Sequence, residues 1–352
     1  MPFTAGQVEQ IGYTAIENWA RNTPPVDQVN YIHPWFAKLN SMKEETVGGK
    51  EMFREQVYID NDDNSQNYFG ADAVTYNERD TTRQTSWAWY NKHTGFGLDE
   101  DTIRGNGLII TDDREAVASD AEKVMLNNLL KTNYYSMDQG FQESLDIEFL
   151  LDGTLSTKSV PGLDHIISTL PTAGTVGGLA ASNAYWQNNV SLGISTGSPA
   201  DGTINAALKD MTRSNSLYGG KMPNFAMAGR SFIEALEAEN RQVNTGFITV
   251  AQRGGTNYDG GVKSTYFNGL EVIWNPTFDK IDETYGSVDV PWTKRCYLLN
   301  MDTIKLRPVS GYWMLTRKPR RLPDRYVHYW ARTCSYRLTC NQRNANAVLS
   351  IA

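Results

Sequence analysis

The chain has few of the residues that would point to a disulfide scaffold, a metal site or a membrane span. Its 352 residues include three cysteines and four histidines. An odd number of cysteines in a chain of this length predicts buried, reduced thiols, which fits synthesis in a cytoplasm. No apolar run reaches the roughly 18 residues of a transmembrane helix, and the N-terminus lacks the basic start and apolar core of a signal peptide. We therefore expect no disulfide framework and no membrane segment.

Positive charge is also scarce. The formal net charge is −7, with 33 Lys and Arg residues against 40 Asp and Glu residues. A protein that binds DNA through its phosphates needs a basic face, so direct DNA binding is not expected to be the main role of this chain. The one dense basic stretch is Arg317, Lys318, Arg320 and Arg321, and the ordinary interpretation of such a stretch is a solvated loop.

Motifs for catalysis and for ligand binding are incomplete. The pattern G-x-S-x-G occurs around Ser195, but a nucleophile elbow needs a helix directly after the serine, and here loop residues follow. A triad would also need a later histidine, and His328 alone is available. A serine hydrolase using Ser195 stays as a minor alternative.

Two further motifs fail at defined positions. The acidic run at 60–64 starts like an EF-hand, but Ser65 and Ala71 occupy the positions of the required glycine and glutamate. The glycines between Gly174 and Gly178 lack the lysine of a phosphate-binding loop, and they predict a tight apolar turn where backbones approach closely. The histidines show no metal-ligand spacing. We expect no catalytic residue, no cofactor and no metal.

The strongest pattern predicts a very long helix over about 113–151. Apolar residues recur every three or four positions without an intervening proline, as expected for one helix face. They are Leu126, Leu130, Tyr134, Met137, Phe141, Leu145 and Phe149. At 1.5 Å per residue, ~35 residues span roughly 50 Å, so this helix would act as a strut.

The segment before this helix predicts an arm and an extended hairpin. A short helix is expected over 7–20, and Trp35 is expected on an arm that lies on another surface. A first strand over 52–60 and a later strand that carries Thr85, Trp87 and Trp89 on one face predict a two-stranded ribbon. Such a ribbon is marginally stable alone, and exposed tryptophans need a partner surface. The alternative is an ordinary hairpin packed on its own domain.

The segment after the long helix predicts a separate α/β lobe over about 200–325. We expect helices at 203–211, with Thr203 as the cap, and at 231–241, and strands at 223–228, 267–274 and 296–306. Residues 326–352 alternate again and are expected to return to the sheet that packs on the long helix.

A family resemblance rests on the residues that follow the helix. They are Gly162-Leu163-Asp164 with Ile166-Ile167, then Thr175-Val176-Gly177-Gly178, then Tyr185-Trp186. With these motifs, the segment 126–186 resembles the major capsid proteins of tailed double-stranded DNA phages, and the resemblance extends more loosely to the C-terminus.

The resemblance implies an α+β fold of the Hong Kong 97 type, with a long spine helix, an extended β-hairpin loop, and peripheral and axial domains. It divides the chain into an N-terminal arm (1–45), the hairpin loop (46–108), the peripheral domain with the spine helix (109–165), the axial domain (166–325) and C-terminal strands (326–352).

The implied function is a major capsid protein, made in the host cytoplasm, that assembles through pentamers and hexamers into the icosahedral shell of the virion. The shell would enclose double-stranded DNA without sequence-specific binding, with portal and scaffold or decoration proteins as partners. The alternative within the fold is an encapsulin-like nanocompartment shell. Because the sequence shows no charged helical N-terminal region of the kind that serves as a built-in scaffold, we expect scaffolding to be a separate protein or unnecessary.

Contacts between subunits are expected at two groups of residues. The first group is aromatic: Trp35, Trp87 and Trp89. The second is charged, with Asp60, Asp62 and Asp63 of one subunit pairing with Arg317, Lys318, Arg320 and Arg321 of a neighbour.

Overall fold

The structure is a computed structural model in which the described residues are 32–48, 51–61, 63, 65–105, 120–217, 219, 222–243, 264–267, 269–286, 290–321 and 327–352. The chain forms two compact units, each assembled from segments that are distant in sequence. The first unit comprises 1–31, 91–145 and 310–335, and the second comprises 32–90, 146–309 and 336–352. The five consecutive regions expected from the sequence remain a prediction. The predicted helix over 7–20 lies outside the described residues.

The first unit is built around residues 120–145 of the long helix α4 (Asp120–Leu150), which confirms the predicted long helix. Of its predicted apolar face, Met137, Phe141, Leu145 and Phe149 are buried, and Tyr134 is half-buried. The helix begins at Asp120 in the described part of the chain, whereas the sequence predicted a start near residue 113, which lies outside it.

Three strands accompany α4 in this unit. They are β3 (Tyr90–Asp99), β12 (Leu315–Arg321) and the first part of β13 (Val327–Cys340), with β13 pairing with both of the others. Phe96 of β3 stacks on Trp330 and meets Tyr134 edge-on, both with ring centroids 5.3 Å apart. Aromatic pairs in these geometries stabilise by about 0.5–1.5 kcal/mol beyond their buried area. The helix α3 (Glu100–Gly105) follows β3.

The second unit contains a six-stranded sheet in the order β6-β14-β10-β7-β9-β8. Its strands are β6 (Asn189–Ile194), β14 (Ala347–Ile351), β10 (Arg295–Leu299), β7 (Phe225–Ala228), β9 (Leu270–Trp274) and β8 (Ser264–Phe267). Two of the pairings, β14 with β6 and β7 with β9, are parallel, and the other three are antiparallel. The sheet is therefore mixed.

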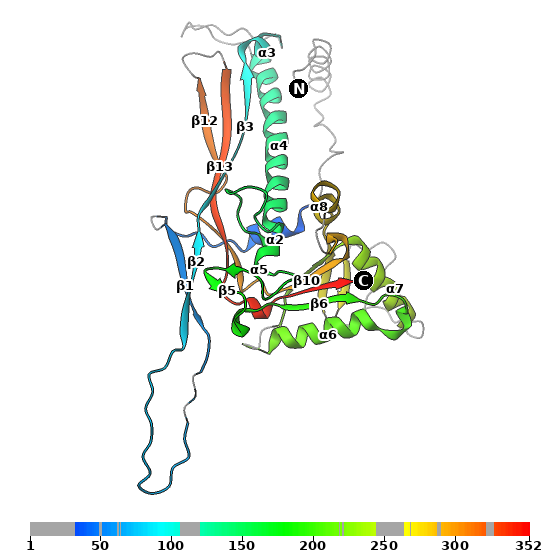
Figure 1. Cartoon of the computed structure of the whole chain (residues 1–352). Helices are drawn as coiled ribbons and strands as arrows, with labels where there is room; N and C mark the ends of the chain where they lie inside the picture. Colours follow the sequence, from blue (N-terminus) through cyan, green and yellow to red (C-terminus); the bar gives the residue numbers. More distant parts are fainter. Residues whose placement is uncertain are drawn as a thin grey trace. The chain divides into compact units, whose positions relative to one another are not determined.

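Helices cover both faces of this sheet (Figure 1). Cys296 and Leu298 of β10 are buried in one cluster with α6 (Thr203–Ser216) and α7 (Arg230–Val243). Tyr297 lies between them in the strand, points to the opposite face and contacts Phe278 of α8 (Thr277–Tyr285) with ring centroids 6.0 Å apart. This alternation follows from the period of two in a strand. Each fully buried large apolar side chain contributes about 1.5–3 kcal/mol.

Three sequence predictions in this unit need correction. The carboxylate of Glu239 caps α6 by accepting from the backbone N–H groups of Ile204 and Asn205, whereas Thr203 donates to the carbonyl of Ser195. The predicted strand 267–274 is a hairpin of β8 and β9, because Gly269 turns the chain with φ +82°.

The predicted strand 296–306 is likewise two strands, β10 and β11 (Ile304–Pro308), separated by a turn that begins at Asn300. The Asn300 side chain accepts from the backbone N–H of Asp302, a bond that favours a turn over a continuous strand. Strand β11 pairs with the second part of β13, and Tyr336 there meets Phe149 of α4 edge-on at 5.3 Å. The C-terminal segment thus supplies β13 to one sheet and β14 to the six-stranded sheet.

The helix α2 (Pro34–Ser41) also belongs to this unit. Trp35 is 0% exposed, and its indole N–H donates to the carbonyl of Phe149 at 3.4 Å. The backbone N–H of Phe36 donates to Asp146 at 2.9 Å. The expectation that Trp35 lies on another surface is therefore wrong, because this side chain fills the core of its own chain.

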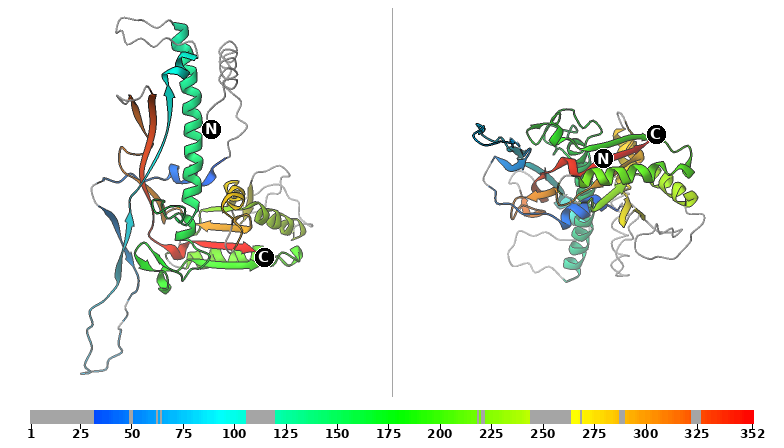
Figure 2. Two further views of the ribbon diagram at one scale, coloured as in Figure 1. Left: turned by 45° about the horizontal axis from the view of Figure 1, so that its top comes forward. Right: turned by 90° about the horizontal axis from the view of Figure 1, so that it is seen from below.

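The extended hairpin forms as predicted. Strands β1 (Met52–Tyr58) and β2 (Thr82–Ala88) pair antiparallel from Met52↔Ala88 to Tyr58↔Thr82, and a long loop joins them. Figures 1 and 2 show this ribbon and its loop extending away from the six-stranded sheet of the same unit. The smaller elements of the unit are α5 (Leu163–Ile166), β4 (Thr175–Val176) and β5 (Leu179–Ala180).

Candidate assembly surfaces

One face of the β1–β2 ribbon is turned to its own unit. Phe53 lies opposite Trp87, and Glu55 lies opposite Thr85, so the alternation of a strand places all four on one face. Trp87 is 6% exposed and donates from its indole to the hydroxyl of Thr85 at 3.2 Å. That hydroxyl donates to the carbonyl of Glu55 at 3.3 Å, so the buried indole is linked back to the paired strand.

The turn between β4 and β5 supports this face. Gly177 and Gly178 have φ values of +59° and +79°, which favour glycine. The backbone N–H of Ser86 donates to the carbonyl of Gly177 at 2.8 Å. A Cβ at Gly177 would lie 2.7 Å from the Trp87 ring, so this site has no room for a side chain. The prediction of a tight turn where backbones approach closely is confirmed.

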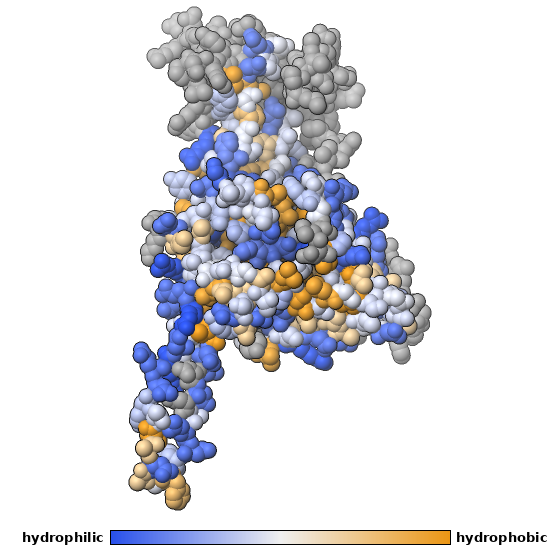
Figure 3. All heavy atoms as spheres, viewed as in Figure 1, coloured by the Kyte–Doolittle hydropathy of each residue, from blue (hydrophilic) through white to orange (hydrophobic). Residues whose placement is uncertain are grey.

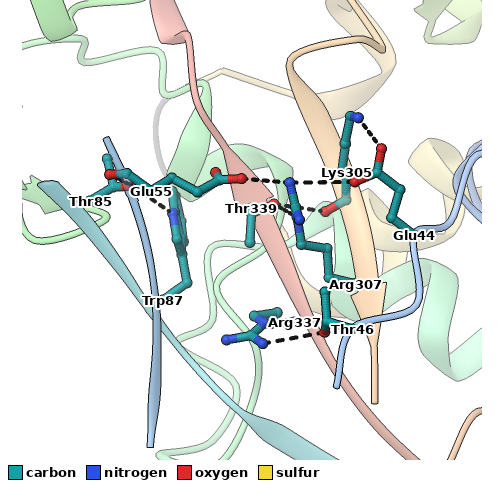
Figure 4. Close-up of polar contacts among 9 residues, drawn as sticks. All are labelled: Glu44, Thr46, Glu55, Thr85, Trp87, Lys305, Arg307, Arg337 and Thr339. Carbon is teal, nitrogen blue, oxygen red and sulfur yellow. Dashed lines mark hydrogen bonds and ion pairs between the residues drawn. The ribbon is translucent and has the colours of Figure 1, made fainter. Parts of the chain in front are cut away.

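Charged side chains join the ribbon to strand β11 (Figure 4). We call Glu44, Glu55, Lys305, Arg307 and Arg337 the root cluster. The Arg307 guanidinium donates to Glu55 at 2.5 Å and to Thr339 at 3.1 Å, and it lies 3.5 Å from Glu44. Lys305 pairs with Glu44. The side chains of Arg307 and Glu55 are 14% and 17% exposed, which gives their ion pair more weight than a surface pair.

Arg337 occupies the other side of this cluster. Its guanidinium lies 4.3 Å from the Phe53 ring centroid and 3.3 Å from that of Trp89, and it donates to the Thr46 hydroxyl at 3.4 Å. Among the described residues, its Nε and Nη1 groups are buried without a hydrogen-bond partner. Burial, and then the nearby charge of Arg307, lower the pKa of Arg337 to about 10. The aromatic rings therefore supply much of the favourable environment of this cation.

The loop at the far end of the ribbon exposes aromatic side chains. Tyr68, Phe69 and Tyr76 are 69%, 89% and 89% exposed. Gln66 and Thr75 exchange two hydrogen bonds across the loop, at 2.8 and 3.1 Å. Figure 3 shows hydrophobic residues among hydrophilic ones along this loop. Exposed aromatic residues gathered on one loop make it a candidate interaction surface.

The three tryptophans predicted to contact another subunit differ in their burial. Trp35 and Trp87 are buried within their own chain, so the expectation that they lie on a neighbouring subunit is corrected. Trp89 is half-buried beside Arg337. Sequence patterns could not separate these tryptophans from the exposed Tyr68, Phe69 and Tyr76, because burial depends on segments that are distant in sequence.

The predicted charged contacts lie in different units. Asp60 and Asp63 are exposed on the hairpin loop, and Asp62 lies outside the described residues. Arg317 is exposed in β12 and donates to the Thr333 hydroxyl at 3.2 Å. Lys318, Arg320 and Arg321 belong to β12, with only their backbone described. Their pairing with Asp60, Asp62 and Asp63 of a neighbour stays a prediction.

The geometry around Ser195 does not form a nucleophile elbow. Strand β6 ends at Ile194, a short 3-10 turn follows at Pro199–Asp201, and α6 begins only at Thr203. Within the described ranges, no three His, Cys, Asp or Glu side chains gather as a metal site requires. No helix in the described part of the chain is long and apolar enough to cross a membrane.

Comparisons with known proteins agree with this architecture. No family model and no curated protein matches the chain. Solved structures do match over nearly the full length. A chain of the cyanophage A-1(L) capsid asymmetric unit aligns with a TM-score of 0.56 and 14% identity, covering 94% of this chain and 98% of its own.

Two further structures give the same result. A chain from the capsid of a native GTA particle has a TM-score of 0.52 and 9% identity, with 94% and 95% covered. A chain of Mycobacterium phage Adephagia has a TM-score of 0.51 and 10% identity, with 100% and 99% covered. With the spine helix, the extended hairpin and the six-stranded sheet all in place, the chain has the Hong Kong 97-type fold of phage capsid subunits.

Proposed function

We propose that this chain is the major capsid protein of a tailed DNA phage, and that many copies assemble into an icosahedral shell around double-stranded DNA. The observation that carries this proposal is the end-to-end match to a phage capsid subunit, which covers 94% of this chain and 98% of that one. A structural role also fits the failed elbow at Ser195 and the acidic net charge of −7, which suits a wall that does not adhere to packed DNA.

The mechanism we propose is self-association through the extended hairpin. A repeated chain that offers one surface to the next copy builds closed symmetric assemblies, here pentamers and hexamers. Tyr68, Phe69 and Tyr76 provide exposed aromatic area on the hairpin loop. Aromatic residues are enriched in the buried centres of protein interfaces. Portal, scaffold and decoration proteins complete the set of proposed partners.

Complementary charges set the register of the contact between neighbouring copies. We place Asp60, Asp62 and Asp63 of one copy against Arg317, Lys318, Arg320 and Arg321 of the next. Such complementarity guides encounter and register more than it adds affinity. The finished shell belongs to the virion, and the subunit is made in the host cytoplasm.

The test is light scattering and negative-stain electron microscopy of the protein, produced alone and together with the proteins encoded beside it. Megadalton shells or ring-shaped capsomers are expected. A stable monomer under both conditions would contradict the proposal. Shells isolated from producing cells should contain DNA, whereas shells that enclose protein and no DNA would favour the nanocompartment.

A further inference from the structure

The root of the hairpin rests on two like charges. The antiparallel register of β11 and β13 places Arg307 directly opposite Arg337. Like charges in directly opposed positions destabilise a strand pair. Both carboxylates of the root cluster, Glu44 and Glu55, lie within ion-pair distance of Arg307, at 3.5 and 2.5 Å. Among the described residues, Arg337 instead has two buried N–H groups without a partner.

Besides Glu44, the groups that offset this repulsion come from the hairpin. The Phe53 ring lies 4.5 Å from the Arg307 guanidinium and 4.3 Å from that of Arg337, so one ring contacts both cations. Trp89, just after β2, contacts Arg337 at 3.3 Å. Glu55 lies two residues after Phe53, so both point to the same side of β1. The ribbon therefore docks through one face on the paired arginines.

The two strands of the ribbon are attached by different means. Strand β2 is held by Trp87 against the Gly177 turn and by the bond from Ser86 to Gly177. Strand β1 is held by Phe53 and by the carboxylate of Glu55 on Arg307. The cluster that packs the six-stranded sheet contains none of these residues. Loss of the Glu55 carboxylate should therefore free β1 from Arg307 while β2 stays attached, so that the ribbon pivots without unfolding the unit.

We propose that Glu55 is a positioning residue for assembly, whose carboxylate holds β1 on the Arg307–Arg337 pair and so fixes the direction in which the hairpin leaves its unit. This inference rests on the proposed capsid function, because the direction of the hairpin determines where its exposed loop meets the next copy. A ribbon that pivots at its root would present that loop at variable angles and give shells of mixed size.

The first test measures the root without requiring assembly. Hydrogen exchange followed by mass spectrometry is compared between the natural chain, Glu55→Gln and the control Glu51→Gln, which removes one exposed acidic charge just before β1. Glu55→Gln should speed amide exchange in 52–58 at least tenfold, with 295–299 unchanged. Glu51→Gln should match the natural chain. Equal protection of 52–58 in all three chains would overturn the proposal.

The second test swaps the two charges of the Glu55–Arg307 ion pair. The double variant Glu55→Arg with Arg307→Glu restores an opposite-charge pair and separates the two opposed arginines. It should recover the exchange rate of 52–58 to within about threefold of the natural chain, whereas Arg307→Glu alone should not. If residues 52–58 exchanged as fast in the double variant as in Arg307→Glu, packing and not the ion pair would fix the ribbon.

Shell size separates this inference from the proposed function. Glu55→Gln should at least double the spread of shell diameters measured by electron microscopy. If the natural chain and Glu55→Gln both formed shells with the same spread of diameters, the positioning role would be overturned and the capsid function would stand. If the natural chain formed no shells, the capsid function would fail, and the exchange measurements would still decide whether Glu55 holds the ribbon.

Discussion

At the scale of single residues, buried polar side chains join segments that are distant in sequence. Arg343 is 0% exposed, and its guanidinium donates to the carbonyls of Ile166 and Trp186 and to the Asn188 side chain, at 2.6–2.8 Å. These partners are neutral, so burial lowers the pKa of this group. One side chain thereby ties the C-terminal segment to the two ends of the stretch that carries the Thr175–Gly178 turn.

The cysteines support a prediction at this scale. Cys296, Cys334 and Cys340 are free and buried, as the sequence predicted. Burial raises the pKa of Cys334 to about 11 and that of Cys340 to about 12, and it also raises the pKa of Cys296. The reactive thiolate is then on the order of 0.1% of Cys334 at pH 8.

We expect the native protein to show no fast reaction with Ellman's reagent at pH 8, and the protein in guanidinium chloride to show all three thiols. The native reaction of Cys334 should accelerate about tenfold per pH unit, because the thiolate fraction rises by that factor below the pKa. A thiol that reacts within seconds in the native protein at pH 8 would contradict this prediction.

At the scale of elements, the Gly177 turn allows a matched comparison of two glycines. Gly177 and Gly174 both have positive φ values, +59° and +76°. A Cβ at Gly177 would meet the Trp87 ring at 2.7 Å, whereas a Cβ at Gly174 would meet nothing within 4 Å. Both alanine variants carry backbone strain, but only one also carries a steric clash.

Gly177→Ala should lower the free energy of unfolding by about 2–4 kcal/mol, and Gly174→Ala by about 1 kcal/mol. The measurement is the urea midpoint at constant slope, with Trp87 among the reporting fluorophores. Equal losses in the two variants would show that the contact between the turn and Trp87 contributes little.

Element prediction from sequence worked where the pattern was long and periodic. The face of α4 was predicted from apolar residues spaced three and four apart, and Met137, Phe141, Leu145 and Phe149 are buried. Short elements were predicted in the right order with wrong limits. Gly269 breaks one expected strand, because a single left-handed residue redirects the chain and a hydrophobic pattern does not register it.

At the scale of the whole molecule, the basic stretch in β12 is the part of the proposed assembly that can be tested by charge. Arg320→Glu with Arg321→Glu should impair shell formation, because the predicted pairing with acidic residues of a neighbour is lost, while the subunit stays folded with a thermal midpoint within about 2 °C. Electron microscopy and differential scanning fluorimetry measure the two effects.

The control carries the same change in charge at another place. Arg213 and Arg230 are exposed on α6 and α7, with side chains 80% and 69% exposed, and both pair with acids on their own helices. Arg213→Glu with Arg230→Glu should leave assembly intact. Normal shells from the β12 variant, or equal failure of both variants, would remove β12 from the contact.

The sequence by itself determined what depends on neighbours along the chain. The spacing of apolar residues predicted α4, the glycines predicted the Thr175–Gly178 turn, and the resemblance of the 126–186 motifs to phage capsid proteins implied the fold. Tertiary structure decided what depends on residues far apart: the burial of Trp35, the cap of α6 by Glu239, and the ion pair of Glu55 with Arg307. The physical reason is that periodicity and backbone freedom are local properties, whereas burial and charge pairing arise only when distant segments come together.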